Sequence, residues 1–337
     1  MSESAGVCAS QISTQAAGSA QAAGAAPRAI RLRLPATTAN LGPGFDALGL
    51  AFDFSLTIEA RVLQGTSGRE LTIAATGRDA ARCSRTHNNM IFETYREILE
   101  RSGRTVYPLD LRIHNEIPLG MGCGSSAAAL LGAVMLANHF GALGWNLQAC
   151  IDEATRREGH PDNVTACALG SMTVSAIELG RVSTVVFGKG LPWRLLLALP
   201  SVGLATEKAR ALLPSMYSRV DAVANVQRVS LLVAAFALGR GDLLRIAMQD
   251  RLHQPYRMEV CPLLPRLLPL MGGLNGPGEP GVLGVVLSGA GPGVLLVADA
   301  DANAEQIVAQ MRLAAGDPAL EIVETSIGPG ASSELLC

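Results

Sequence analysis

The chain has 337 residues, of which 49% are hydrophobic and 17% charged, a composition that can bury a large core and is far from that of a disordered chain. Its 27 Lys+Arg nearly balance its 29 Asp+Glu, and aromatic residues make up only 4%. Nucleic-acid-binding proteins normally carry a basic surplus or an aromatic stacking surface, so we expect no nucleic-acid partner. The continuous apolar runs are much shorter than the ~20 residues that cross a bilayer, so we expect no membrane partner.

Lysines and cysteines exclude two further kinds of site. Only Lys189 and Lys208 occur, and neither stands in the Gly-Lys-Ser/Thr sequence of a Walker loop, so phosphate chemistry here would need another device. The seven cysteines are scattered and form no Cys-x-x-Cys pair, which indicates neither a zinc site nor a disulfide framework. Reduced thiols are typical of a cytoplasmic protein, the localisation we expect.

Residues 1–29 differ from the rest of the chain, because Ala, Ser, Gly and Gln dominate them and large apolar side chains are scarce. Such a stretch cannot offset its conformational entropy, and we expect a disordered tail; its single Arg makes an organellar transit peptide the weaker alternative. After it, the length predicts two domains that share an interface. We place them at 30–190 and 191–337, and no strong linker marks the boundary.

Periodicity predicts the elements that follow in chain order. Alternating apolar residues predict strands, and apolar residues at helical spacing predict helices. In the first domain we expect strands at 30–34, 52–60, 71–73 and 109–113, and helices at 91–99, 127–140 and 147–158. In the second we expect strands at 195–199, 282–287, 294–298 and 320–325, and helices at 206–213, 219–238 and 302–315. Because strands and helices cluster without long β-α-β alternation, we predict an α+β fold.

The strongest motif is PLGMGCGSSAA, residues 118–128, between a predicted strand and a predicted helix. Glycines at alternate positions let the backbone approach a ligand, because no Cβ stands in the way. Free N–H groups at the start of the following helix favour phosphate oxygens, and the paired serines offer hydroxyls to phosphate or magnesium. The G-x-G-x-G spacing is not that of a dinucleotide fingerprint. The motif predicts a phosphate-binding loop rather than a capped turn.

A second motif, PATTANLGPGFD at residues 35–46, lies on the turn between the first two predicted strands. Asn40 and Asp46 are polar residues on a loop made rigid by Gly and Pro, where a small polar substrate can be held. The carboxylate of Asp46 suits a substrate ammonium or hydroxyl. Taken alone, either residue would instead predict an Asx-turn.

Two more clusters of polar and glycine residues follow. EGHPDN, residues 158–163, brings a Glu, a His, an Asp and an Asn together at the end of a predicted helix, whereas a lone His would be read as structural. LSGAGPG, residues 287–293, lies between two apolar strands and would alone predict a hairpin turn. Beside the first glycine loop, we expect it to bring more backbone N–H groups to the same phosphates.

These four motifs, in this order, resemble those of the GHMP small-molecule kinases, named after galactokinase, homoserine kinase, mevalonate kinase and phosphomevalonate kinase. Within that superfamily, residues 35–49 and 159–164 are most similar to the homoserine kinase family. The resemblance runs from about residue 30 to about residue 325. It implies a ribosomal-protein-S5-like N-terminal domain that holds ATP, a ferredoxin-like C-terminal domain, and an active site between them.

The resemblance also implies ATP-dependent phosphorylation of the hydroxyl of L-homoserine to O-phospho-L-homoserine in threonine biosynthesis, with Mg²⁺ as cofactor and a homodimer as the assembly. Carried across position by position, it assigns ATP binding to Asn89, Pro118, Leu119, Gly120, Met121, Gly122, Cys123, Gly124, Ser125, Ser126, Ala127 and Ala128.

The same comparison assigns homoserine binding to Asn40, Asp46, His160, Asn163, Arg210 and Arg257. The two arginines would hold the carboxylate, which guanidinium forks match in two-point contacts. Ser126 and Glu158 would bind Mg²⁺, with Glu153 as a second choice. We expect Ser288, Gly289 and Gly291 to support the phosphate loop.

Three positions depart from the family pattern: Cys123 replaces Leu, Ala166 replaces Pro, and Gly293 replaces Thr or Ser, which removes one possible phosphate contact. Where several superfamily members carry an Asp that takes the substrate proton, this chain has Asn163, which cannot act as a base. We therefore expect phosphoryl transfer without a dedicated protein base, with Asp162 as the rival base. Another GHMP kinase activity, or a non-catalytic ligand sensor with the same fold, remains open.

Overall fold

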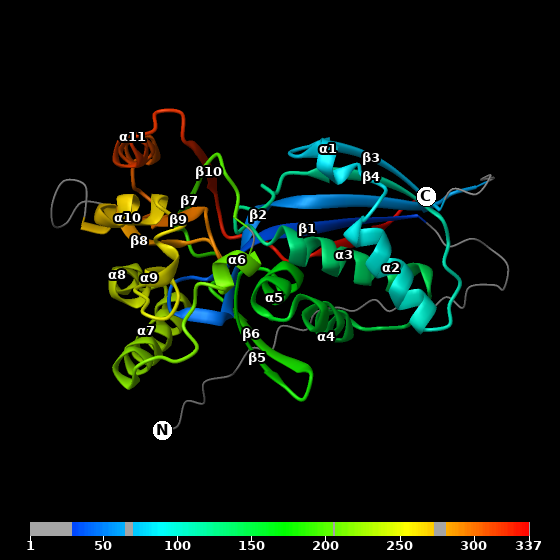
Figure 1. Ribbon diagram of the computed structural model, residues 1–337, viewed down its shortest axis with the longest axis horizontal. Helices are drawn as coiled ribbons and strands as arrows, with labels where there is room; N and C mark the ends of the chain where they lie inside the picture. The colour runs from blue at the N-terminus through cyan, green and yellow to red at the C-terminus, as the bar shows by residue number, and fades with distance from the viewer. Residues whose placement is uncertain (1–28, 65–69, 205, 273–280, 337) are drawn as a thin grey trace, which may run out of the picture.

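The computed structural model describes residues 29–64, 70–204, 206–272 and 281–336 (Figure 1). The predicted tail, residues 1–29, lies outside the described residues except for Ala29. The described chain forms two β-sheets that lie beside each other along the long axis of the molecule, each with its own helices. The α+β class predicted from the sequence is confirmed.

The larger sheet has seven strands in the order β11-β1-β2-β4-β3, with β5 and β6 extending from β2. Their bounds are β1 (Ile30–Asn40), β2 (Gly44–Val62), β3 (Leu71–Gly77), β4 (Leu109–Asn115), β5 (Met172–Glu178), β6 (Arg181–Phe187) and β11 (Ser332–Leu335). Alternation in β1 buries Leu32 and Leu34, while Arg31 faces the other way and pairs with Glu59 of β2 at 2.8 Å. One turn joins β1 to β2, and that turn carries the second motif.

Helices cover one side of this sheet (Figure 1). They are α2 (Met90–Arg101), α3 (Ser125–Phe140), α4 (Leu147–Glu158) and α5 (Asp162–Leu169), with the short α1 (Ala80–Cys83) at the end of β3. The helix α3 is apolar on all sides because it lies among α2, α4, α5 and the sheet. Its N-terminus therefore emerges from the protein core at the glycine loop.

The smaller sheet is antiparallel, in the order β10-β7-β9-β8. Its strands are β7 (Arg194–Leu199), β8 (Val282–Leu287), β9 (Val294–Ala298) and β10 (Glu321–Thr325). The helices of this half are α6 (Thr206–Arg210), α7 (Arg219–Leu238), α8 (Leu244–Ala247), α9 (Gln254–Arg257), α10 (Leu263–Leu267) and α11 (Ala304–Ala315), with 3₁₀ turns η1 (Gly241–Leu243) and η2 (Leu268–Gly272). The β-α-β-β-α-β sequence with this strand order is the predicted ferredoxin-like topology.

The end of the chain returns to the larger sheet. β11 pairs with β1, and isolated bridges join Phe52 to Ile327 and Gly170 to Pro329. Of the segment 191–337 predicted as the second domain, these last residues pack with the N-terminal half instead. β11 consists of two serines, a glutamate and a leucine, all exposed and without apolar alternation, which is why the sequence did not reveal this strand. The division near 190 stays a prediction.

A single apolar core connects the two halves. Leu34 of β1, Leu197 of β7 and Phe236 of α7 belong to one continuous cluster of buried side chains. A second cluster fills the space between the outer face of the smaller sheet and the helices α10 and α11. The two sheets are thus held against each other by buried apolar contacts, and the four motifs meet where they join.

Candidate active site

A cavity of about 80 Å³ lies between the two halves of the molecule. All four motifs contribute to its lining. It brings together every residue expected to hold homoserine, both expected Mg²⁺ ligands and the glycines of the phosphate loop: Asn40, Asp46, His160, Asn163, Arg210, Arg257, Ser126, Glu158, Gly120, Gly122 and Gly124. Residues separated by more than two hundred positions in the sequence therefore face one space.

Backbone geometry defines the phosphate loop. Gly122 and Gly124 have φ values of +76° and +66°, and there is no room for a side chain at either position. A Cβ at Gly122 would lie 1.9 Å from the carbonyl oxygen of Ser288, and one at Gly124 would lie 1.9 Å from Oγ1 of Thr37. No side chain caps the N-terminus of α3, so its N–H groups are left for an anion.

Three predicted members of the loop face the protein interior instead. Ala127 and Ala128 are completely buried in the core, and the Cys123 side chain is 1% exposed. Burial raises the pKa of the Cys123 thiol to about 12, so the thiol stays uncharged beneath the loop. These residues shape the loop by packing, and only their backbone is in a position to contact a nucleotide.

The second glycine loop supports the first through hydrogen bonds. The Ser288 hydroxyl donates to the carbonyl of Gly122 at 2.8 Å, and Asn40 Nδ2 donates to the carbonyl of Gly289 at 3.0 Å. The N–H groups of Ser288, Gly289 and Gly291 already donate to the carbonyls of Gly293, Ala39 and Ser288. These three N–H groups are therefore held within the protein, and a direct contact of this loop with the phosphates stays a prediction.

Ser126 and Glu158 form a pair of oxygen ligands beside the loop. The Ser126 hydroxyl donates to Glu158 Oε2 at 2.8 Å, and burial raises the pKa of the Glu158 carboxyl. Among the described residues no group of three His, Cys, Asp or Glu side chains could hold a metal. One carboxylate and one hydroxyl nevertheless fit Mg²⁺, which keeps several waters and takes further oxygens from substrate phosphates.

Glu153, the second choice for Mg²⁺, is already occupied by cations. Its carboxylate accepts hydrogen bonds from Arg101, Arg156 and Arg157, each with a contact of 2.8 Å. It does not line the cavity between the two halves. The structure therefore places Glu158, and not Glu153, beside Ser126.

Two arginines and one carboxylate form another group in the lining of this cavity. Arg210 binds both oxygens of Asp46, at 2.8 and 2.9 Å, while Arg257 is 1% exposed and forms no ion pair with any carboxylate in the described part of the chain. Both guanidiniums lie over the ring of Phe45, at 5.4 and 5.6 Å. The main-chain N–H of Asp46 donates to Asn40 Oδ1 at 3.0 Å, which shapes the loop between them.

His160, Asp162 and Asn163 form a hydrogen-bonded group at the start of α5. Asp162 Oδ1 accepts from His160 Nδ1 at 2.8 Å and from the Asn163 N–H at 2.6 Å. Burial acts to lower the pKa of His160, but the hydrogen bond and charge of Asp162 outweigh it and raise that pKa. Asn163 Oδ1 accepts from the Thr37 hydroxyl at 2.8 Å, a contact that the sequence did not predict although Thr37 belongs to the second motif.

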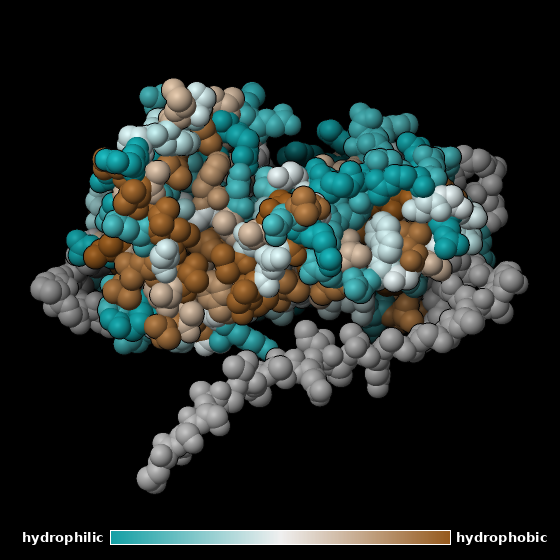
Figure 2. All heavy atoms as spheres, turned by 90° about the horizontal axis from the view of Figure 1, so that it is seen from below, coloured by the Kyte–Doolittle hydropathy of each residue, from teal (hydrophilic) through white to brown (hydrophobic). Residues whose placement is uncertain are grey.

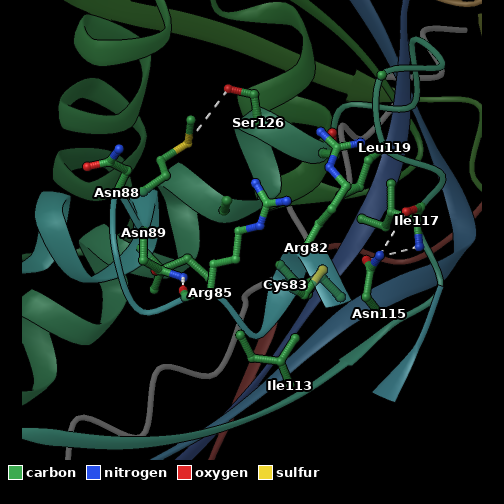
Figure 3. A pocket seen from close by; sticks show the side chains of 16 residues that line it. Arg82, Cys83, Arg85, Asn88, Asn89, Ile113, Asn115, Ile117, Leu119 and Ser126 are labelled. Atoms are coloured by element: carbon green, nitrogen blue, oxygen red, sulfur yellow. Dashed lines mark hydrogen bonds between the residues drawn. The ribbon is translucent and has the colours of Figure 1, made fainter. Parts of the chain in front are cut away.

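A second cavity of about 350 Å³ opens on the other side of the phosphate loop and shares Gly120, Ser125 and Ser126 with the first (Figure 3). Asn89 lines it, but its amide is held locally: Oδ1 caps α2 by accepting from the Phe92 N–H, and Nδ2 donates to the carbonyl of Arg85. The remaining predicted ATP-binding residues divide between this cavity, which Leu119 lines, and a third one lined by Pro118 and Met121.

Comparison with known proteins identifies the family. The model of the GHMP kinases N terminal domain matches residues 89–171, and that of the GHMP kinases C terminal matches residues 232–316. A homoserine kinase of Solibacter usitatus is 47% identical over 267 residues, which cover 79% of this chain and 84% of the relative. The chain belongs to the homoserine kinase family of GHMP kinases.

Two further matches agree with this family. A homoserine kinase of Synechocystis sp. is 37% identical over 279 residues, covering 82% of this chain and 88% of the relative. The crystal structure of homoserine kinase from Cytophaga hutchinsonii has the same fold, with a TM-score of 0.75 over 92% of this chain and 98% of that chain, at 23% identity. The family resemblance and the two-domain fold expected from the motifs are thus confirmed.

Proposed function

We propose that this chain transfers the γ-phosphoryl group of ATP to the hydroxyl of L-homoserine, as a cytoplasmic enzyme of threonine biosynthesis. The observation that carries the proposal is a single cavity with a glycine loop and a helix N-terminus at one end and two guanidiniums with a carboxylate at the other. The first end suits phosphate and the second suits an amino acid. The two sets of groups therefore match the phosphates of ATP and an amino acid, the reactants of a kinase whose relatives are named homoserine kinases.

At the nucleotide end, the triphosphate of ATP lies along residues 118–126 and the base enters the cavity that Asn89 lines. Ser126 and Glu158 would hold Mg²⁺, which would supply positive charge against the phosphate oxygens. The backbone of the loop and the N-terminus of α3 orient the transferring group. Because both lie on a rigid, buried scaffold, little reorganisation is needed in the transition state.

At the other end, homoserine is held by its charged groups. Arg257 and Arg210 bind its carboxylate, and Asp46 and Asn40 lie on the loop that receives its ammonium group. His160 and Asn163 then face the hydroxyl end, near Ser126 and Glu158. This orientation places the nucleophilic oxygen toward the phosphate loop, as in-line transfer requires.

Transfer proceeds without a dedicated protein base. Asn163 has no basic group that could take the substrate proton. The raised pKa of His160 keeps its ring protonated over a wider pH range, and a protonated ring cannot act as a base. Asp162 is 1% exposed, and Oδ1 already accepts hydrogen bonds from His160 and Asn163. A loose transition state needs little deprotonation of the attacking hydroxyl, so the proton leaves late, to phosphate or water.

An ATPase-coupled assay with homoserine, mevalonate and galactose tests the substrate, and Asp162→Asn tests the base. We expect phosphorylation of homoserine and a decrease in kcat of about tenfold or less for Asp162→Asn, because positioning and charge carry the reaction. Turnover of another alcohol would identify a different GHMP kinase, and ATP binding without turnover would identify a ligand sensor. A kcat loss of about a thousandfold in Asp162→Asn would make Asp162 the base.

The assembly we propose is a homodimer that uses the apolar face of α7. Val220, Val223 and Val226 are 66%, 50% and 63% exposed, and Figure 2 shows hydrophobic side chains gathered on this side of the molecule. By length and composition alone, α7 is the one described helix that could cross a membrane. However, Asn225 of α7 is buried and donates to Asp250 of the same chain, so one face of α7 packs within the protein. For the exposed valines we therefore favour a second copy of this chain over a bilayer. Sedimentation of Val223→Glu against the unmodified chain tests this, with loss of dimer expected.

A further inference from the structure

The environment of Arg257 is unusual for a buried cation. Within the described residues, none of its partners is a carboxylate: Nη1 lies 3.0 Å from His253 Nδ1, and its contacts with the carbonyls of Ala209 and Gly289 are longer, at 3.4 and 3.5 Å. A buried guanidinium is normally paired with an anion, because desolvating an unpaired charge is costly. Here the one close acceptor is an imidazole that is itself completely buried.

The hydrogen bonds of His253 determine its tautomer. Nε2 lies 2.7 Å from the carbonyl oxygen of Gly42, which can only accept, so Nε2 carries the proton. Nδ1 faces the Arg257 guanidinium, which can only donate, so Nδ1 presents its lone pair. Both bonds are made together only by a neutral ring protonated at Nε2. The carboxylate of Asp250, 3.6 Å from Nε2, opposes this neutrality, but burial and the charge of Arg257 lower the pKa of His253.

We propose that His253 is a positioning residue that orients Arg257 without cancelling its charge, so that the charge remains for the carboxylate of homoserine. An aspartate or glutamate at this position would hold the guanidinium equally well, but it would neutralise it before the substrate arrives. The inference rests on the proposed function, in which Arg257 binds that carboxylate.

The same ring connects the two parts of the amino-acid site. Through Nε2 it holds Gly42, and its face stacks on Phe45 at 5.3 Å, both on the loop that carries Asn40 and Asp46. Through Nδ1 it holds Arg257 on α9. One side chain thus determines the distance between the group expected to bind the substrate carboxylate and the loop expected to receive the ammonium group.

Three substitutions separate orientation, charge and packing. In His253→Gln, the amide oxygen can accept from Arg257 and the NH₂ can donate to Gly42, so the KM for homoserine should rise no more than about threefold. His253→Glu has the same size but adds an anion, and His253→Leu removes the acceptor; for both we expect a rise of about 10- to 100-fold, the effect of losing a hydrogen bond to a charged group. The KM for ATP should not change in any of them.

Equal increases for His253→Gln and His253→Glu would overturn the proposal, because neutrality would then not matter, and an unchanged KM in His253→Leu would overturn it too. The ¹⁵N chemical shifts of His253 in the unmodified protein give a test that does not depend on a variant folding. We expect a neutral ring protonated at Nε2 at pH 7, and an imidazolium or an Nδ1–H form would contradict the inference. Absence of homoserine kinase activity in the unmodified protein would instead refute the proposed function.

Discussion

The two ends of the cavity achieve binding by different means. At the phosphate end, the loop from Pro118 to Ser126 presents backbone N–H groups and contains no cationic side chain. At the amino-acid end, Arg210, Arg257 and Asp46 present full charges. Phosphate oxygens are numerous and similar, so a set of oriented dipoles is sufficient for them. An α-amino acid has two distinct charges at a fixed separation, and recognising it requires charged groups of both signs.

Different kinds of substitution should impair binding at the two ends. Backbone binding depends on space, because the loop carbonyls lie within van der Waals distance of the second glycine loop. Side-chain binding depends on charge and on the hydrogen bonds that direct it, such as those of His253. A methyl group should therefore do most harm at the phosphate end, and the loss of a charge should do most harm at the amino-acid end.

The largest effect we expect is from Gly122→Ala. The added Cβ would lie 1.9 Å from the carbonyl oxygen of Ser288, a backbone atom that cannot rotate away, and φ is +76°. The loop would have to shift, and its backbone N–H groups would no longer point at the phosphates. We expect kcat/KM for ATP to fall by about a thousandfold or more, because misplaced N–H groups lose most of their electrostatic contribution. Steady-state kinetics with varied ATP measures it.

Gly120→Ala is the matched control within the same loop. Gly120 has nearly the same φ, +75°, but a Cβ there would meet nothing within 4 Å. Within the protein it meets only the left-handed backbone strain of about 1–2 kcal/mol, so we expect a modest loss of stability in thermal unfolding and a smaller loss of kcat/KM for ATP than in Gly122→Ala. Equal losses of activity in the two variants would show that strain, and not the contact with Ser288, controls the loop.

An intermediate effect is expected at Glu158, a full charge expected to act at the phosphate end. Glu158→Gln keeps the shape of the side chain but removes the charge that would hold Mg²⁺ beside Ser126. We expect kcat to fall by about 100-fold and the Mg²⁺ requirement to rise, comparable to the loss of one electrostatic group in a preorganised site. Activity measured against Mg²⁺ concentration reports both.

Glu153→Gln, on the same helix, provides the comparison for Glu158. Its carboxylate is 10% exposed and held by three arginines outside the cavity, so we expect a loss of stability but no change in the Mg²⁺ requirement. If Glu153→Gln changed that requirement and Glu158→Gln did not, the metal site would have to be moved along α4.

The sequence predicted the phosphate end well, because its geometry is local. Alternate glycines followed by serines and a small-residue helix specify a loop and a helix N-terminus within a few residues, and the structure has both. The sequence placed Asn89 just before a helix, but it did not predict that the Asn89 side chain caps the N-terminus of that helix, α2. The phosphate contact expected of residues 287–293 stays a prediction, because three of their N–H groups donate to carbonyls within the protein.

For the amino-acid end, the sequence predicted which residues take part but not how they contact one another. Resemblance to a family named Arg210 and Arg257, but neither the pairing of Arg210 with Asp46 nor the isolation of Arg257 can be read from spacing. The pairing of Arg210 with Asp46 joins residues 164 positions apart and arises only once the two halves pack together. Arg257 contacts His253 four positions away, but the carbonyls of Ala209 and Gly289 that complete its surroundings come from distant segments. The return of β11 to β1 was missed for the same reason, since pairing between distant segments leaves no local pattern.

The smallest difference we predict within a pair of variants is between the two arginines. Arg257→Ala should raise the KM for homoserine by about 100-fold, because it removes a buried charge that no carboxylate partner weakens. Arg210→Ala should raise that KM by only about tenfold. The Arg210 side chain is 43% exposed and already shares its charge with Asp46, so water and that carboxylate weaken its contribution. The KM for ATP serves as the internal control and should stay constant in both variants. Equal effects of the two substitutions would mean that homoserine displaces Asp46 and engages both guanidiniums alike, and the amino-acid end would then depend on the number of charges rather than on their burial.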